Sequence, residues 1–165
     1  MTTAWLHSES SLKSMAADVA RVWRTVGIEP PLVVGLQGDL GAGKTTWVRA
    51  LLAGLGYVGN VPSPTYTLLE HYECESLEIV HLDLYRLGCD EDLENIGIRD
   101  WLARDDAWIL AEWPQRAPHF AARCDLLLDI AIDSGEGRRI HWRTQTERGR
   151  RALAVLDELF SNYQR

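Results

Sequence analysis

Residues 38–45, with the sequence GDLGAGKT, constrain what this chain can fold into more than any other stretch. They match the pattern G-x-x-x-x-G-K-[ST] at every fixed position, which is typical of a loop that binds phosphate groups. Gly41 and Gly43 let the backbone curl so that successive N–H groups point inward, and a side chain at either position would hinder that curl. Lys44 can then reach the β- and γ-phosphates of a nucleotide, and the Thr45 hydroxyl can bind Mg²⁺.

The sequence on either side of this loop has the order that such a site requires. Residues 32–36, LVVGL, form a short apolar run that predicts a buried strand. After the loop, apolar residues recur at helical spacing, and Gly54 and Gly56 supply stop signals. The residues that predict the apolar side of this helix are Trp47, Val48, Leu51, Leu52 and Leu55. The positive end of the helix dipole would add to the attraction for phosphate.

Composition narrows the class of protein. The chain has 165 residues, of which 46% are hydrophobic, as expected for a single domain that spans residues 1–165. The formal net charge of −7 argues against a protein that grips nucleic acid broadly, since such grips rest on many Lys and Arg side chains. The three cysteines are scattered and form no CxxC motif, and the start lacks a basic and apolar leader. These features, with no apolar run near about 18 residues, predict a cytoplasmic protein without a membrane span.

The remaining pattern predicts an α/β fold with a mixed sheet. Residues 67–73 and 77–83 predict two strands whose short connection implies an antiparallel hairpin, and 126–132 and 138–143 predict a second pair around the turn 133–137. Two further strands are expected, an edge strand at 3–7 and a buried strand at 107–113. A helix capped by Ser10 or Ser11 should end at Gly27, and short helices within 90–104 should be capped by Asp90. A last helix should start near Glu147 and include Leu159. We therefore expect a single-domain, three-layer phosphate-loop fold with a parallel core and antiparallel additions.

Two acids are expected at the carboxyl ends of strands, where ligands bind in open α/β sheets. Glu112 closes the apolar run 107–111, and Asp83 closes the run 79–82. Mg²⁺ prefers hard oxygen ligands and keeps several waters, so Thr45 and one or two carboxylates suffice beside phosphate oxygens. We predict that Glu112 is a direct or water-mediated Mg²⁺ partner. Asp83 is either a second partner or the group that orients an attacking water.

Residues 59–67, GNVPSPTYT, form a surface connection after the loop helix. Ser63 or Thr65 could present a hydroxyl to Mg²⁺ or the γ-phosphate, as switch segments do, or the segment could be a plain proline turn. His81 shares a strand face with Asp83, and we expect it to pack beside that acid rather than to bind a metal. His71 and Cys74 are three residues apart in a predicted strand, which argues against a zinc pair.

Several motifs, taken in order, resemble the bacterial TsaE (YjeE) family. They are the phosphate loop through Thr46, SPTYTL at 63–68, HLDLYRL at 81–87, ENIGIRD at 94–100 and EWP at 112–114. The phosphate loop alone occurs in many families, whereas the later motifs in series are far more specific. The resemblance covers roughly residues 30–115, and the flanking segments match only loosely.

The resemblance implies a small mixed-sheet phosphate-loop fold that binds ATP and Mg²⁺ and hydrolyses ATP slowly. It implies work with the TsaB and TsaD proteins, the transferase pair that modifies adenosine 37 of certain tRNAs, with tRNA itself contacted indirectly or weakly. It assigns catalysis to Lys44, Asp83 and Glu112, and metal binding to Thr45, Glu112 and Asp83. The residues that it assigns to nucleotide binding are Gly38, Asp39, Gly41, Ala42, Gly43, Lys44, Thr45, Thr46, Ser63 and Thr65.

Some residue roles stay open at this level. Trp113, beside Glu112, could contact a partner or the nucleotide, or could pack in the core. Arg86 and Arg116 are either candidates for a rate-enhancing arginine or members of surface pairs. The basic stretch within 138–151 could touch tRNA, or could be a solvated hairpin and helix start.

Three other functions compete with an ATPase. A small phosphate-loop kinase would need a second pocket and an arginine-rich lid, and Arg99, Arg104 and Arg116 are too dispersed to form one. A GTPase normally carries an N-K-x-D motif, and none of the asparagines is followed by lysine. A scaffold protein that binds nucleotide only as a structural ligand would keep its function without the Glu112 carboxylate.

Overall fold

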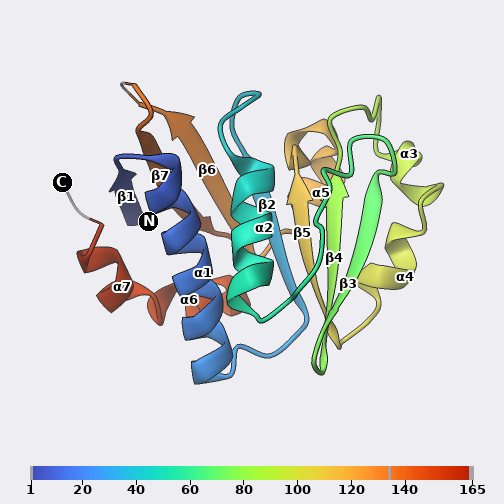
Figure 1. The fold of residues 1–165 in the computed structure, drawn as a ribbon. Coiled ribbons are helices and arrows are strands. Elements are labelled where there is room, and N and C mark those ends of the chain that lie inside the picture. The colour runs from blue at the N-terminus through green and yellow to red at the C-terminus, as the bar shows by residue number, and fades with distance from the viewer. Residues whose placement is uncertain (1, 134, 164–165) are drawn as a thin grey trace.

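The computed structural model describes residues 2–133 and 135–163, which are arranged around one mixed sheet (Figure 1). Its strands are β1 Thr2–Leu6, β2 Leu32–Gln37, β3 Leu69–Cys74, β4 Leu77–Asp83, β5 Ala107–Glu112, β6 Leu126–Ile132 and β7 Arg138–Thr144. The seven strands lie in the order β1-β7-β6-β2-β5-β4-β3. Strand β2 pairs parallel with β5 and β6, and β5 pairs parallel with β4. The pairs β3–β4, β6–β7 and β1–β7 are antiparallel, so the predicted mixed sheet with a parallel core is confirmed.

The central strands β2 and β5 are buried along nearly their whole length. Their sequences, LVVGLQ and AWILAE, show no polar alternation, as expected for parallel strands that are covered on both faces. Leu36 is paired with Glu112, so the two strands end at the same edge of the sheet. The loop that follows β2 therefore lies beside the last residue of β5.

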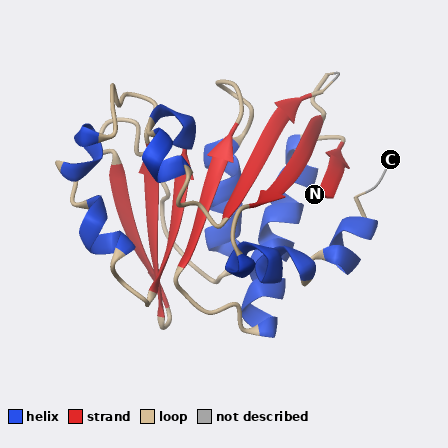
Figure 2. Ribbon diagram, turned by 180° about the vertical axis from the view of Figure 1, so that it is seen from behind, coloured by secondary structure: helices blue, strands red, loops and turns tan. Residues whose placement is uncertain are grey.

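Helices cover both faces of the sheet. Helices α1 Glu9–Val26 and α2 Lys44–Gly54 lie on the face seen in Figure 1. The shorter elements are α3 Glu91–Glu94, α4 Ile98–Leu102, the 3₁₀ helix η1 Pro114–Arg116, α5 Pro118–Ala121, α6 Glu147–Ala154 and α7 Asp157–Ser161. Seen from behind in Figure 2, α4 and α5 cover the opposite face, where they pack on a second apolar cluster. None of the described helices is long and apolar enough to cross a membrane.

Four tryptophans tie the larger core together. Trp23 of α1 meets Trp108 of β5 and Trp142 of β7 edge-on, at ring-centre distances of 5.5 and 6.2 Å. Trp47 of α2 meets the same Trp142 at 5.7 Å. Each of the four side chains is at most 1% exposed. Edge-on aromatic pairs add about 0.5–1.5 kcal/mol each beyond the apolar area they bury, so this cluster fixes both long helices against the sheet.

The ends of two helical segments differ from the sequence prediction. The cap of α1 is Ser8 rather than Ser10 or Ser11, because Ser8 has the extended backbone that a cap needs and its hydroxyl accepts a hydrogen bond from the Ser11 amide at 3.1 Å. The predicted last helix breaks into α6 and α7, because Val155 and Leu156 leave the helical hydrogen-bond pattern between them.

Asp90 was predicted to cap the short helices within 90–104, and it has no capping bond there. Its carboxylate instead accepts hydrogen bonds from the amides of His119 and Phe120 at the start of α5. A negative charge at that position is favourable because helix N-termini carry unpaired N–H groups. In the predicted turn 133–137, Ser134 lies outside the described residues.

We predict that Ser8→Ala lowers the free energy of unfolding by about 1 kcal/mol, because it removes the cap of α1. Urea denaturation followed by circular dichroism measures this change. The matched control is Ser10→Ala on the exposed side of the same helix, for which we expect no loss, since alanine favours helix. Equal losses in both variants would contradict the cap assignment.

Candidate active site

The loop between β2 and α2 contains two glycines that have a positive φ and closely packed surroundings. Gly38 has a φ of 141°, and a Cβ atom there would lie 2.2 Å from the carbonyl oxygen of Ile130. Gly43 has a φ of 113°, and its Cβ would lie 2.5 Å from the Leu12 side chain. The loop is therefore pressed between the end of β6 and the start of α1, which holds its curl in place.

Lys44 begins α2 and folds back over the loop. Its Nζ donates hydrogen bonds to the carbonyl oxygens of Gly38 at 2.7 Å and Asp39 at 2.8 Å. The same ammonium group lies 4.0 Å from the centre of the Trp113 ring. Burial lowers the pKa of Lys44, and the nearby carboxylates oppose that shift by favouring the charged form. The positive charge thus sits where a phosphate chain on the loop would need it.

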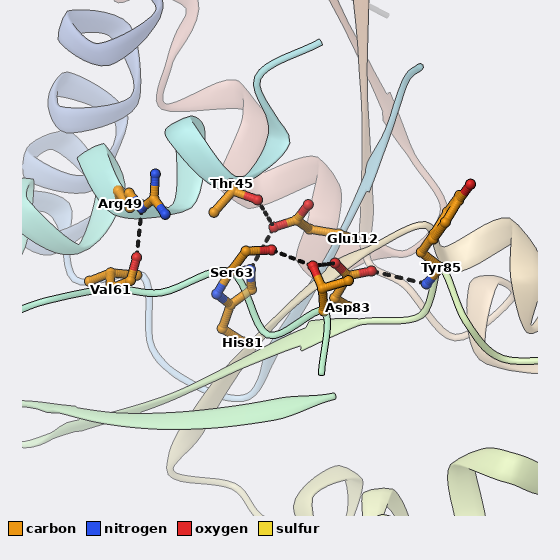
Figure 3. A network of polar contacts seen from close by, with 9 residues as sticks. Thr45, Arg49, Val61, Ser63, His81, Asp83, Tyr85 and Glu112 are labelled. Atoms are coloured by element: carbon orange, nitrogen blue, oxygen red, sulfur yellow. Dashed lines mark hydrogen bonds and ion pairs between the residues drawn. The ribbon is translucent and has the colours of Figure 1, made fainter. Parts of the chain in front are cut away.

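The two acids predicted from strand ends are neighbours in the sheet. Asp83 of β4 is paired with Glu112 of β5, and both are almost fully buried. Thr45 of α2 donates its hydroxyl to Glu112 Oε1 at 2.7 Å, as Figure 3 shows. The structure therefore brings together the hydroxyl and the carboxylates that the sequence predicted as metal partners.

Glu112 has a second donor that sequence reasoning placed elsewhere. His81 was expected beside Asp83, but its Nε2 donates to Glu112 Oε1 at 2.8 Å (Figure 3). The difference arises because β4 and β5 are adjacent and parallel, which brings the neighbouring strand's acid within reach. His81 is fully buried, and among the described residues its Nδ1 has no hydrogen-bond partner.

Asp83 holds the connection 59–67 in place. Its Oδ2 accepts the Thr65 hydroxyl at 3.1 Å, and Thr65 is in turn 2.8 Å from the Ser63 hydroxyl. Its Oδ1 accepts the Tyr85 amide at 3.0 Å. At the start of the same connection, Arg49 Nε donates to the Val61 carbonyl at 2.6 Å, so α2 anchors the segment too (Figure 3).

A cavity of about 260 Å³ opens at this edge of the sheet. Most of the predicted nucleotide residues line it, whereas Gly38, Asp39 and Ala42 do not. The lining residues are Leu40, Gly41, Gly43, Lys44, Thr45, Thr46, Ser63, Thr65, Asp83, Tyr85, Glu112 and Trp113. Both predicted acids face the same space as the phosphate loop, which is what binding of a cation and a phosphate chain together requires.

An aromatic pair borders this cavity. Tyr85 lies 5.0 Å from Trp113 between ring centres, and Trp113 has the left-handed backbone with a φ of 59° directly after Glu112. Arg116 rests on the Tyr85 ring at 5.2 Å, and Arg86 rests on the Tyr66 ring at 4.3 Å. Both guanidinium groups thus lie over tyrosine rings, and neither arginine lines the cavity.

One contact to the loop was not anticipated. Arg138, the first residue of β7, donates from Nε to the Ala42 carbonyl at 2.7 Å. The sequence analysis grouped this residue with the basic side chains of 138–151, because no local sequence pattern predicts its contact with the loop. Strand β6 pairs with both β2 and β7, and this order of strands places Arg138 next to the loop that follows β2.

The fold and the loop place the chain among the phosphate-loop α/β proteins. A family model described as "Threonylcarbamoyl adenosine biosynthesis protein TsaE" matches residues 6–140. The chain belongs to the TsaE family. This match reaches beyond residues 30–115 on both sides and takes in α1 and the start of β7.

Individual proteins agree with this assignment. The chain is 38% identical over 154 residues to the Haemophilus influenzae "tRNA threonylcarbamoyladenosine biosynthesis protein TsaE". The aligned residues cover 93% of this chain and 96% of that protein. It is 34% identical over 137 residues to the protein of the same name from Aquifex aeolicus, covering 82% and 90%. The crystal structure of Bacillus subtilis YdiB is similar in fold, with a TM-score of 0.75, 22% identity, and 96% and 95% of the two chains covered.

We predict that Gly38→Ala destabilises the protein more than Gly41→Ala by at least about 2 kcal/mol. A methyl group at Gly38 would meet the Ile130 carbonyl, whereas Gly41 has no neighbour within 4 Å of the added atom and carries only the strain of its φ of 77°. Urea unfolding of both variants measures the difference. Equal destabilisation would contradict the described seat of the loop on β6.

Proposed function

We propose that this chain is a Mg²⁺-dependent ATPase that serves the threonylcarbamoylation of adenosine 37 in tRNA. The observation that carries the proposal is the 2.7 Å hydrogen bond from Thr45 Oγ1 to Glu112 Oε1 at the phosphate loop. It joins the hydroxyl and the carboxylate that a magnesium site of this kind needs. Membership of the TsaE family supports the biological setting.

The loop is proposed to bind the phosphates of ATP. Backbone amides at the start of α2 would donate to phosphate oxygens, and the helix dipole would add to the attraction. Lys44 would exchange the carbonyls of Gly38 and Asp39 for phosphate oxygens. Because those carbonyls already hold its ammonium group at the loop, little ordering of the side chain is needed on binding.

The donor set fits Mg²⁺. Thr45, Glu112 and Asp83 all offer hard oxygen atoms and line one cavity. Glu112 would hold the ion directly or through water, beside the Thr45 hydroxyl. Bound Mg²⁺ would neutralise charge on the β- and γ-phosphates. Asp83 is either a second partner of the ion or the acceptor that orients the attacking water, in both cases through the Oδ2 atom that now accepts the Thr65 hydroxyl.

Turnover by the isolated chain is proposed to be slow. Among the described residues, no arginine lines the cavity. A guanidinium group aimed at the transferred phosphate can raise the rate by about 10³–10⁵. We propose that the TsaB and TsaD proteins complete the site when they dock.

Contact with tRNA is proposed to be indirect or weak. Several basic side chains near the end of the chain are already paired with acids. Arg143 is paired with Asp129, and Arg150 and Arg151 are paired with Glu147.

We also propose a cytoplasmic location, where ATP, tRNA and reduced thiols occur together. The three cysteines are free thiols in the structure, which supports this location.

Substitution of Glu112 by glutamine tests the proposed chemistry. Glutamine can still accept the Thr45 hydroxyl but lacks the negative charge, so we expect nucleotide binding to persist and ATP hydrolysis to fall by about 100-fold or more. Phosphate release and equilibrium titration with a fluorescent ATP analogue measure the two quantities. Glu158→Gln, at an exposed position of α7, is the matched control, and Lys44→Ala should lose binding itself. Unchanged hydrolysis in Glu112→Gln would remove Glu112 from the mechanism.

Reconstitution tests the need for partners. We expect the purified chain to release phosphate far more slowly than about 1 s⁻¹ and the TsaB–TsaD pair to accelerate it at least about tenfold. Phosphate release is measured with and without the pair, and modified adenosine is measured in tRNA by mass spectrometry. Turnover of tens per second by the chain alone would refute partner dependence, and formation of modified tRNA without this chain would refute its role.

A further inference from the structure

Arg138 contacts the phosphate loop from outside. Besides the Nε bond to the Ala42 carbonyl, its Nη2 lies 3.4 Å from the Gly41 carbonyl. Its Nη1 donates to the carbonyls of Glu136 at 3.0 Å and Gly137 at 2.9 Å. The guanidinium group thus links the turn before β7 to the loop through backbone oxygens alone. Its charge also acts on Glu9 at the start of α1, whose pKa is lowered mainly by Lys13 and to a smaller extent by Arg138.

The geometry of the peptide unit gives this contact a directional consequence. The peptide bond is planar and trans, so the C=O of Ala42 and the N–H of Gly43 point in opposite directions. Because Arg138 holds the carbonyl on the outer side, the Gly43 amide faces the inner side, where Gly43 lines the cavity. No described group accepts a hydrogen bond from that amide, so it is available to a phosphate oxygen.

The loop is confined on its other side by α1. Gly43 packs against the Leu12 side chain, since a Cβ atom added at Gly43 would lie 2.5 Å from Leu12 Cδ2. Arg138 and Leu12 therefore act on neighbouring peptides from two different elements. Rotation of the Ala42–Gly43 unit would break the hydrogen bond to Arg138.

We infer that Arg138 is a positioning residue for phosphate binding, which holds the Ala42–Gly43 peptide with its amide turned toward the nucleotide. This inference rests on the proposed function of the loop as an ATP site. Arg138 itself touches no phosphate in this arrangement. Arg138 acts through the backbone. Its positive charge also stabilises the partial negative charge on the Ala42 carbonyl oxygen.

Three variants separate this role from simple charge. Arg138→Met keeps an unbranched side chain as far as the Nε position and removes every donor. Arg138→Lys keeps the charge and loses the planar group that serves several carbonyls at once. Arg139→Met removes the same charge from the next residue, which is exposed and paired with Trp5 across the sheet. Affinity for a fluorescent ATP analogue with Mg²⁺ is measured for each, together with amide hydrogen exchange of residues 38–46 in protein without nucleotide.

We expect Arg138→Met to bind the analogue at least about tenfold more weakly and to exchange loop amides faster, with the rest of the sheet unchanged. Arg139→Met should stay within about twofold of the original chain, and Arg138→Lys should regain only part of the loss. Full recovery in Arg138→Lys, or equal weakening by Arg139→Met, would overturn positioning in favour of charge alone. If the original chain binds no nucleotide, the proposed function fails. The exchange measurement then still decides the role of Arg138, and unchanged loop exchange in Arg138→Met would refute it.

Discussion

The arrangement of this site depends on one buried carboxylate with two donors. Glu112 Oε1 accepts the Thr45 hydroxyl at 2.7 Å and His81 Nε2 at 2.8 Å. These residues belong to the first turn of α2, the end of β5 and the middle of β4, so a single oxygen atom joins three elements. A carboxylate that is 3% exposed and lacked donors would destabilise the fold by several kcal/mol. The hydrogen bonds offset that cost and fix the distance between the loop helix and the sheet edge.

The second acid repeats this arrangement on the other side of the cavity. Asp83 accepts the Thr65 hydroxyl, as Glu112 accepts that of Thr45. Each acid therefore accepts a hydrogen bond from a hydroxyl of a segment that borders the same cavity. Both carboxylates are held in place by these hydrogen bonds, and in the proposed magnesium site a cation would take over oxygen atoms that are already positioned. Such preorganisation is what makes fixed charges effective at a phosphate.

The sequence predicted the parts of the site that lie in contiguous motifs. The strand, loop and helix around Lys44, and the strand ends at Asp83 and Glu112, follow from apolar runs and from the rule that ligands bind beyond parallel strands. Two contacts could not be predicted because they depend on which strands are neighbours. His81 bonds to Glu112 only because β4 lies beside β5, and Arg138 reaches the loop only through β6 and β7. Local rules also predicted the cap of α1 at Ser10 or Ser11, whereas the structure has it at Ser8. Three serines lie within four positions, and the backbone angles, which the sequence does not show, decide among them.

The pairing of β1 with β7 has a consequence for the order in which the molecule is completed. Residues 2–6 are made well before their partners at 138–142, with Thr2 opposite Trp142 and Leu6 opposite Arg138. At about 5–20 residues per second, a ribosome makes the two strands roughly 7–27 seconds apart. During that interval the central strands β2, β4 and β5 can pair, while one margin of the sheet stays open. The arginine that contacts the phosphate loop is therefore synthesised long after the loop itself.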